Sequence, residues 1–102
     1  MSESLLSSRN LAFELYEVLD AEGLTQRERF ADHNRETFDA AIGTARGIAE
    51  ELFAPHNRKN DEHEPQYVDG AAVLIPEVEP ALRAFHDAGF LNATRDFEHG
   101  GM

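Results

Sequence analysis

The chain has 102 residues, of which 41% are hydrophobic and seven are Phe, so it can fold as one domain around an apolar core. Its formal net charge of -11, from 20 acidic and 9 basic side chains, repels phosphate and anionic lipid, which argues against nucleic-acid and membrane-surface partners. The lack of Cys excludes disulfides, thiolate zinc sites and cysteine nucleophiles, and fits a cytoplasmic protein. Residues 1–6 do not resemble a signal peptide, and no apolar stretch reaches the ~18 residues that a membrane-spanning helix needs.

A first helix is predicted after Ser7 or Ser8, since either side chain can cap its start. Apolar residues follow the cap at helical spacing, namely Leu11, Phe13, Leu15, Tyr16, Val18 and Leu19. Gly23 is the expected end of this helix, because glycine readily adopts the left-handed conformation that terminates helices. The polar stretch 25–33 is predicted to be a loop or a short helical turn that holds Phe30.

The clearest element is a long helix that begins at Asn34 and ends near Phe53. Asn34 is expected to cap it, while Glu36 and Asp39 place negative charge near its positive end. One apolar face recurs over about five turns at 3.6 residues per turn. The residues of this face are Phe38, Ala41, Ile42, Ala45, Ile48, Ala49 and Leu52. Pro55 is expected to end the helix, because proline pushes the residue before it out of helical geometry.

Gly43 and Gly47 lie inside this predicted helix, four residues apart. Each costs ~1 kcal/mol relative to Ala, so a reason for both is expected. The pair can allow another helix to cross closely or can leave room for a ligand. We favour the close crossing, because small residues let backbones approach and most helix faces pack against protein.

The segment 56–66 is predicted to be an exposed, charged connection. It gathers His56, Asp61, Glu62, His63 and Glu64, but their spacing matches no helical metal-ligand pattern, so a solvated loop is favoured over a metal centre. The neighbouring carboxylates Glu50 and Glu51 point about 100° apart on a helix, which favours a solvated face over an acid–base pair. We therefore predict no catalytic residue and no metal ligand in this chain.

Asp69-Gly70 suits a tight turn between two short apolar runs, which predicts a small β-hairpin. A last helix is expected between Pro76 and Gly89, and its inward-facing residues are predicted to be Val78, Ala81, Leu82 and Phe85. Together the elements predict an all-α fold: an orthogonal bundle of three to five helices in a single domain over residues 1–102, with a possible hairpin around Asp69-Gly70.

The order of these motifs resembles the N-terminal helical domain of the acyl-CoA dehydrogenase family, closest to its methylmercaptopropionyl-CoA dehydrogenase-like branch. The likeness covers the chain from about Asn10 onward. It rests on residues 13–19 (FELYEVL), residues 49–55 (AEELFAP), Asn57 and Asp61, Asp69-Gly70, Pro76, Gly89 and residues 98–101 (EHGG). The chain continues only to Met102 after its last glycine pair, so we expect it to be a fragment of a longer enzyme.

The resemblance implies a flavoprotein that oxidises an acyl-CoA thioester between its α and β carbons. In such enzymes a carboxylate removes the α proton while FAD accepts hydride from the β carbon. The family fold implies that flavin and base belong to two further domains, so the 102-residue chain alone is not expected to bind FAD or to be catalytic. It implies acyl-CoA as the substrate and an electron-transfer protein as a partner of the full-length enzyme.

By the same resemblance this domain forms one wall of the acyl pocket, and the residues to which that role transfers are Phe97, His99, Gly100 and Gly101. Phe90, Leu91, Phe97 and Met102 are also expected to form an apolar patch through which the chain forms a homo-oligomer or self-associates. The alternative is a free-standing acidic helical module that binds a protein partner through its apolar helix face and has no enzymatic activity.

Overall fold

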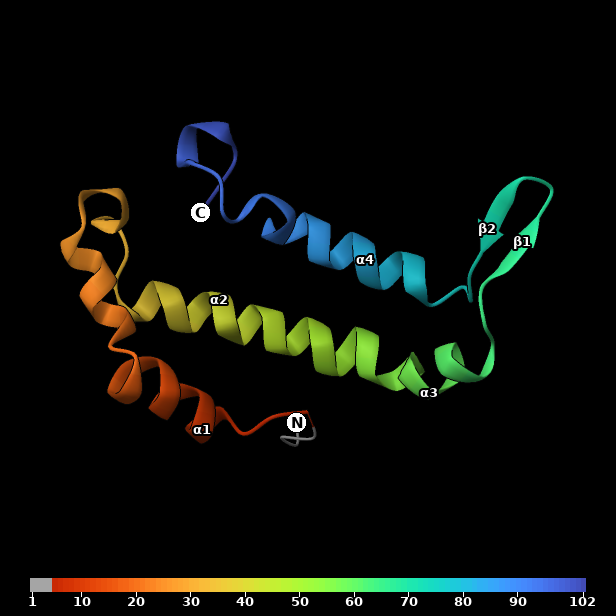
Figure 1. The fold of residues 1–102 in the computed structure, drawn as a ribbon, viewed down its shortest axis with the longest axis horizontal. Coiled ribbons are helices and arrows are strands. Elements are labelled where there is room, and N and C mark those ends of the chain that lie inside the picture. Colours follow the sequence, from red (N-terminus) through yellow and green to blue (C-terminus); the bar gives the residue numbers. More distant parts are fainter. Residues whose placement is uncertain (1–4) are drawn as a thin grey trace. The chain divides into compact units, whose positions relative to one another are not determined.

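The structure is a computed structural model and describes residues 5–102. These residues form four α-helices and one two-stranded antiparallel sheet, and 65% of them are helical (Figure 1). The mostly-α class with a small β-hairpin is therefore confirmed. The chain divides into two units, Met1–Thr44 and Ala45–Met102, which are described in turn. The orthogonal packing of one domain over residues 1–102 stays a prediction.

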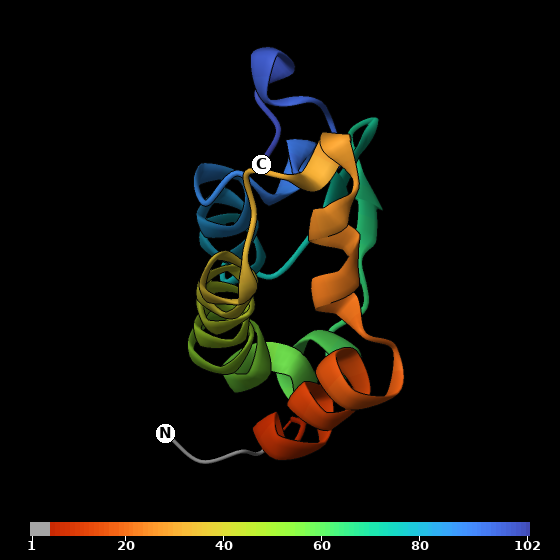
Figure 2. The same cartoon turned by 90° about the vertical axis from the view of Figure 1, so that its left-hand side faces the viewer.

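The first unit opens with α1, Ser8–Ala12, which continues directly into a π-helical turn, Phe13–Val18 (Figure 2). Ser7 caps α1 as predicted, since its Oγ accepts a hydrogen bond of 3.3 Å from the Asn10 N–H. The predicted end at Gly23 is wrong. Asp20 instead adopts the left-handed conformation, with φ of 51°, because short Asp side chains tolerate it. Gly23 lies inside the 3₁₀ turn Ala21–Gln26 that follows.

The helix α2, Arg35–Ile48, begins directly after Asn34, as predicted. The Asn34 Oδ1 accepts a hydrogen bond of 2.9 Å from the Thr37 N–H, and the Thr37 Oγ1 accepts one of 3.0 Å from the Asn34 N–H. This reciprocal pairing satisfies two backbone donors that a helix start leaves open. A short 3₁₀ turn, Glu28–Phe30, lies in the polar stretch ahead of it, as the sequence predicts.

The long helix does not end at Pro55. After α2 the chain forms a π-helical turn, Ala49–Phe53, and then α3, Ala54–Glu62. Pro55 lies in the first turn of α3, where a missing backbone N–H costs nothing because that donor has no partner within the helix. The π-helical turn breaks the regular hydrogen-bond ladder just before the proline, which lets a new helix start there. The predicted exposed connection 56–66 is therefore helical as far as Glu62.

The hairpin is confirmed, with β1 at Gln66–Val68 and β2 at Ala71–Val73. The strands pair antiparallel, with Tyr67 opposite Ala72. Asp69 and Gly70 both have positive φ, at 49° and 81°, which is the type I′ geometry that matches the twist of hairpin strands.

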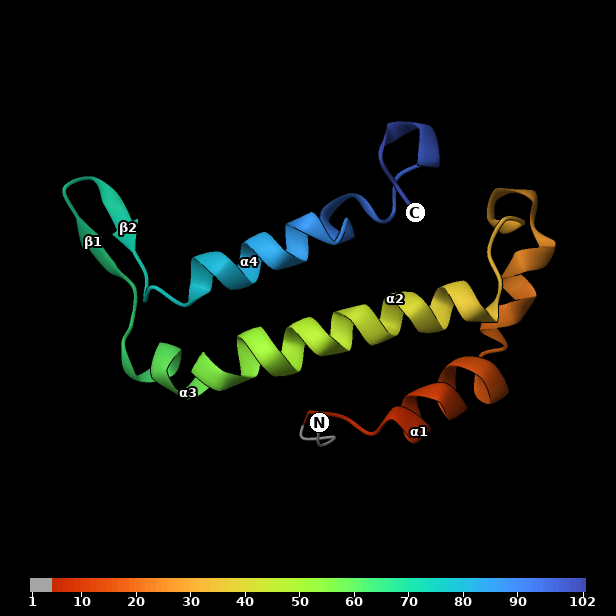
Figure 3. The ribbon, with the colours of Figure 1, turned by 180° about the vertical axis from the view of Figure 1, so that it is seen from behind.

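The helix α4, Val78–Asp87, runs back antiparallel to the helical stretch of residues 45–53 (Figures 1 and 3). Gly89 follows it with φ of 88°, so the predicted glycine stop is confirmed. Ala81 is only 1% exposed and is the one fully buried apolar residue among residues 5–102. Leu82 faces residues 45–53, as predicted, but it is not buried, since its side chain is 52% exposed. It lies about 100° around the helix from the buried Ala81.

The close helix crossing favoured at Gly43 and Gly47 is also not found. Within residues 5–102, nothing lies within 4 Å of the place where a Cβ at either glycine would be. The backbone at both positions is helical, so neither glycine is needed for a special conformation. Both glycines are therefore replaceable as far as the described part of the chain is concerned.

Candidate functional site

The predicted pocket residues lie in a turn that closes the second unit. A 3₁₀ turn, Phe97–His99, follows Asp96. The Gly101 N–H then donates a hydrogen bond of 3.1 Å to the Asp96 carbonyl, and the Met102 N–H donates one of 3.3 Å to the Ala93 carbonyl. These backbone bonds fold residues 93–102 into a closed loop, called the terminal turn below.

Both glycines of the terminal turn are required by its geometry. Gly100 has φ of 86°, a conformation that side-chain-bearing residues rarely adopt. Gly101 has no room for a side chain, because a Cβ there would lie 1.6 Å from the carbonyl oxygen of Arg95. The glycine pair is thus fixed by two separate causes, backbone conformation at the first position and close backbone approach at the second.

The terminal turn presents its side chains to the surface. Phe97 is 85% exposed, and the exposed His99 places its Nε2 3.6 Å from Glu98 Oε1. The structure brings Phe97, His99, Gly100 and Gly101 together on one turn. Their role in an acyl pocket stays a prediction.

Two open grooves lie in the second unit. One, called the inner groove, has a volume of about 340 Å³ and an almost wholly apolar lining. It is lined by Ala45, Ile48, Ala49, Phe53, Leu82 and Phe85. The other, called the hairpin groove, has a volume of about 590 Å³ and lies along the end of β2 and α4. Its apolar lining residues are Ala72, Leu74, Ile75, Pro76, Val78, Leu82 and Leu91, and its polar ones are Glu79, Arg83 and His86.

Two titratable side chains that the sequence predicts to be exposed are buried in the structure. Glu50 is only 4% exposed and accepts a hydrogen bond of 3.1 Å from Arg46 Nε, so the solvated position predicted for it is wrong. His56 is 6% exposed, and its ring centroid lies 5.9 Å from that of Phe53. The spacing of Arg46 and Glu50, four apart on a helix, is the signal that predicts their ion pair. The burial of His56 follows only once the helix is known to continue past Pro55.

An ion pair joins α3 to the residue before α4. Lys59 Nζ donates a hydrogen bond of 2.8 Å to Glu77 Oε2. This bond, together with one from the backbone N–H of Glu77, holds the pKa of the Glu77 carboxyl below its usual range, and the nearby His56 lowers it slightly further.

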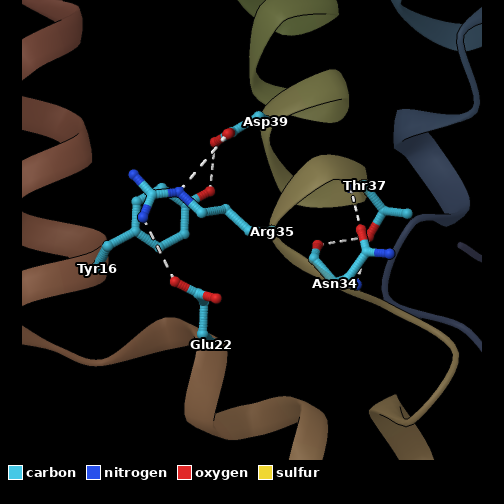
Figure 4. Close-up of polar contacts among 6 residues, drawn as sticks. All are labelled: Tyr16, Glu22, Asn34, Arg35, Thr37 and Asp39. Atoms are coloured by element: carbon cyan, nitrogen blue, oxygen red, sulfur yellow. Dashed lines mark hydrogen bonds and ion pairs between the residues drawn. The ribbon is translucent and has the colours of Figure 1, made fainter.

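The first unit contains a polar cluster centred on Tyr16 (Figure 4). The Tyr16 hydroxyl donates a short hydrogen bond to Asp39 Oδ1, and the Arg35 guanidinium lies 4.0 Å from the Tyr16 ring centroid. Arg35 also pairs with Glu22 at 3.5 Å and with Asp39 at 3.9 Å. Burial and the hydrogen bond to Asp39 raise the pKa of Tyr16 to about 12. The cluster fastens the first helical stretch to α2 through side chains 23 residues apart.

In residues 5–102 no three His, Asp or Glu side chains gather closely enough to hold a metal ion. The histidine–carboxylate run at 56–64 is split, because His56 is buried in α3 whereas His63 and Glu64 are exposed beyond it.

Residues 5–102 contain no helix that is both long and apolar enough to cross a membrane.

Comparison of the chain with protein-family models, with curated proteins and with solved structures finds no match.

Proposed function

We propose that this chain is the N-terminal helical domain of an FAD-dependent acyl-CoA dehydrogenase. It contributes one wall of the acyl pocket and packs against the domains that hold the flavin and the base. The enzyme removes two hydrogens from the α and β carbons of an acyl-CoA thioester, passes electrons to a protein acceptor, and acts in the cytoplasm as a homo-oligomer.

The terminal turn is the observation that carries this proposal. The resemblance rests in part on the closing Gly100-Gly101 pair, and the geometry requires glycine at both positions. Because the need for glycine comes from the backbone of the turn itself, the turn can keep its shape whatever packs against it. A loop that forms a rigid pocket wall needs this property. Phe97 and His99 then supply the apolar and polar side chains that such a wall presents.

Exposed apolar side chains give further support. Leu82, Leu91 and Phe97 in the second unit are each more than half exposed, and Ala81 alone is fully buried among the apolar residues described. Apolar side chains gathered at a surface mark places where other protein packs. We expect the missing domains to cover them.

The grooves of the second unit do not fit FAD. The inner groove offers almost no polar atom to a pyrophosphate, and Arg83, which lines the hairpin groove, is paired with Glu79 at 2.5 Å. This supports the proposal that the flavin binds to residues outside this chain.

The test is the coding sequence downstream of the Met102 codon, followed by the absorption spectrum of the encoded protein. We expect the frame to continue for several hundred residues and the purified full-length protein to show a flavin spectrum that acyl-CoA bleaches. The 102-residue chain, purified in parallel, should be colourless. A stop codon directly after Met102, or a colourless full-length protein, would overturn the proposal.

The inner groove favours a second candidate, a protein-interaction module without enzymatic activity. Its apolar lining between two antiparallel helical stretches can accept a helix from a partner. This reading needs no further domains, so the downstream coding sequence also separates it from the dehydrogenase.

A further inference from the structure

The hairpin leaves backbone hydrogen-bonding groups open on its edges. In a hairpin with a two-residue turn, the pair next to the turn is hydrogen-bonded and the next pair is not. Val68 and Ala71 form the first pair and Tyr67 and Ala72 the second, so the N–H and C=O of Tyr67 and Ala72 point away from the partner strand. No third strand is present in residues 5–102. A two-stranded sheet alone is only marginally stable in water, so a further strand would stabilise it.

The edge of β2 is the one that can accept a strand. On the edge of β1, the outward-facing position two residues before Tyr67 is Pro65, which has no N–H to donate. On the edge of β2, the position two residues after Ala72 is Leu74, which keeps its N–H. The β2 edge thus offers two outward N–H groups, at Ala72 and Leu74, before Pro76 ends it, whereas the β1 edge offers only that of Tyr67.

The hairpin groove lies beside this edge. Ala72 and Leu74, which carry the open backbone groups, also line the groove, and Val78 and Leu82 of α4 line it with them. A strand added to β2 would place alternate side chains into a groove of about 590 Å³. Seven of its ten lining residues are apolar, and the charged Glu79 and Arg83 in the lining are paired with each other, so the groove favours apolar side chains at every second position of the added strand.

The negative charge around the hairpin indicates which side chains the added strand should carry at the positions that do not enter the groove. Residues 60–82 carry six acidic side chains, Asp61, Glu62, Glu64, Asp69, Glu77 and Glu79, and no Lys or Arg. Arg58, Lys59 and Arg83, at the ends of this segment, pair with only three of the six. A second copy would bring the same negative charge, whereas a basic segment would be attracted.

We propose that the β2 edge and the hairpin groove bind an extended segment of a partner protein that alternates apolar and basic residues. Binding is by strand addition: Ala72 and Leu74 pair with its backbone, the groove takes its apolar side chains, and the acidic surroundings attract its Lys or Arg. The inference does not depend on the dehydrogenase proposal, because it uses only residues of this chain.

The test is a titration of the 102-residue chain with a capped hexapeptide of alternating Val and Lys, followed through the backbone amide signals of the protein. We expect the Ala72 and Leu74 amides to shift most. The affinity should fall at least tenfold for a peptide that is N-methylated on its pairing edge. It should fall equally far for a second peptide in which Glu replaces Lys. Leu91→Glu, in the hairpin groove, should weaken binding at least tenfold, whereas Leu52→Glu, an equal charge change outside the groove, should leave it unchanged.

Several outcomes would overturn the inference. They are no binding of the Val–Lys peptide, equal binding of its N-methylated or Glu-containing form, and equal effects of Leu91→Glu and Leu52→Glu in variants that keep the native melting temperature. Concentration-dependent shifts of Ala72 and Leu74 without any peptide would instead assign the edge to a second copy of this chain.

Discussion

Two glycine pairs in this chain look equally telling in the sequence and differ in structure. Gly43 and Gly47 lie in the regular helical stretch of α2 and have empty space where a Cβ would be. Gly100 and Gly101 close the terminal turn, where one has φ of 86° and the other touches the backbone of Arg95. A glycine is thus informative about structure only where the backbone itself requires it.

The start of α2 and the terminal turn are each stabilised by hydrogen bonds, but the bonds come from different parts of the chain. At the start of α2, the Asn34–Thr37 cap and the Tyr16–Asp39 hydrogen bond are made by side chains. In the terminal turn, the bonds from the Gly101 and Met102 amides to upstream carbonyls are made by the backbone. Substitutions should therefore act through side-chain chemistry in the first region and through backbone geometry in the second.

The largest effect is expected for Gly101→Ala. The added methyl cannot fit at 1.6 Å from the Arg95 carbonyl oxygen, so the terminal turn must open, at a cost on the order of 3 kcal/mol. Hydrogen exchange of the Gly101 and Met102 amides measures the opening. If these amides keep their protection, the close approach at Gly101 does not exist in solution.

Gly100→Ala should cost less, about 1–2 kcal/mol, because the methyl meets no neighbour within 4 Å and only the left-handed φ is penalised. Gly100→Asn is the matched control, since Asn tolerates this conformation better and should lose less protection. Equal losses for Ala and Asn would show that the conformation at residue 100 is not the cause.

Tyr16→Phe removes one hydrogen bond at the start of α2 and should lower the free energy of unfolding by about 1 kcal/mol at neutral pH. Because the pKa of Tyr16 is raised in the fold from 10.0 to about 12, its contribution is present below pH 10 and is lost as pH rises toward 12. The difference between wild type and Tyr16→Phe in urea unfolding should therefore shrink over this window. A difference that stays constant with pH would contradict the Tyr16–Asp39 bond.

The smallest effect, and the one of opposite sign, is expected for Gly43→Ala. Alanine fits the helix without a clash and should stabilise the chain by about 0.5–1 kcal/mol, measured as a rise in melting temperature. Gly47→Ala should behave alike. Destabilisation by either would show that another surface approaches α2 there.

Local signals in the sequence determined much of the fold. The Ser7 and Asn34 caps, the Asp69-Gly70 turn and the glycine stop after α4 each follow from one or two residues and their backbone preferences. The order of the motifs also supplied the family resemblance, which stays a proposal. Preferences of this kind act over a few residues, so they can be read without knowing what lies nearby.

The tertiary structure decided the features that depend on which residues pack against one another. Whether Pro55 ended a helix or started one depended on the π-helical turn before it, and that turn decided the burial of His56. The exposure of Leu82 and the empty space beside Gly43 likewise depend on which surfaces meet. Hydrophobic burial is non-directional, so an apolar face shows that a residue can be buried, and only the packed fold shows what buries it.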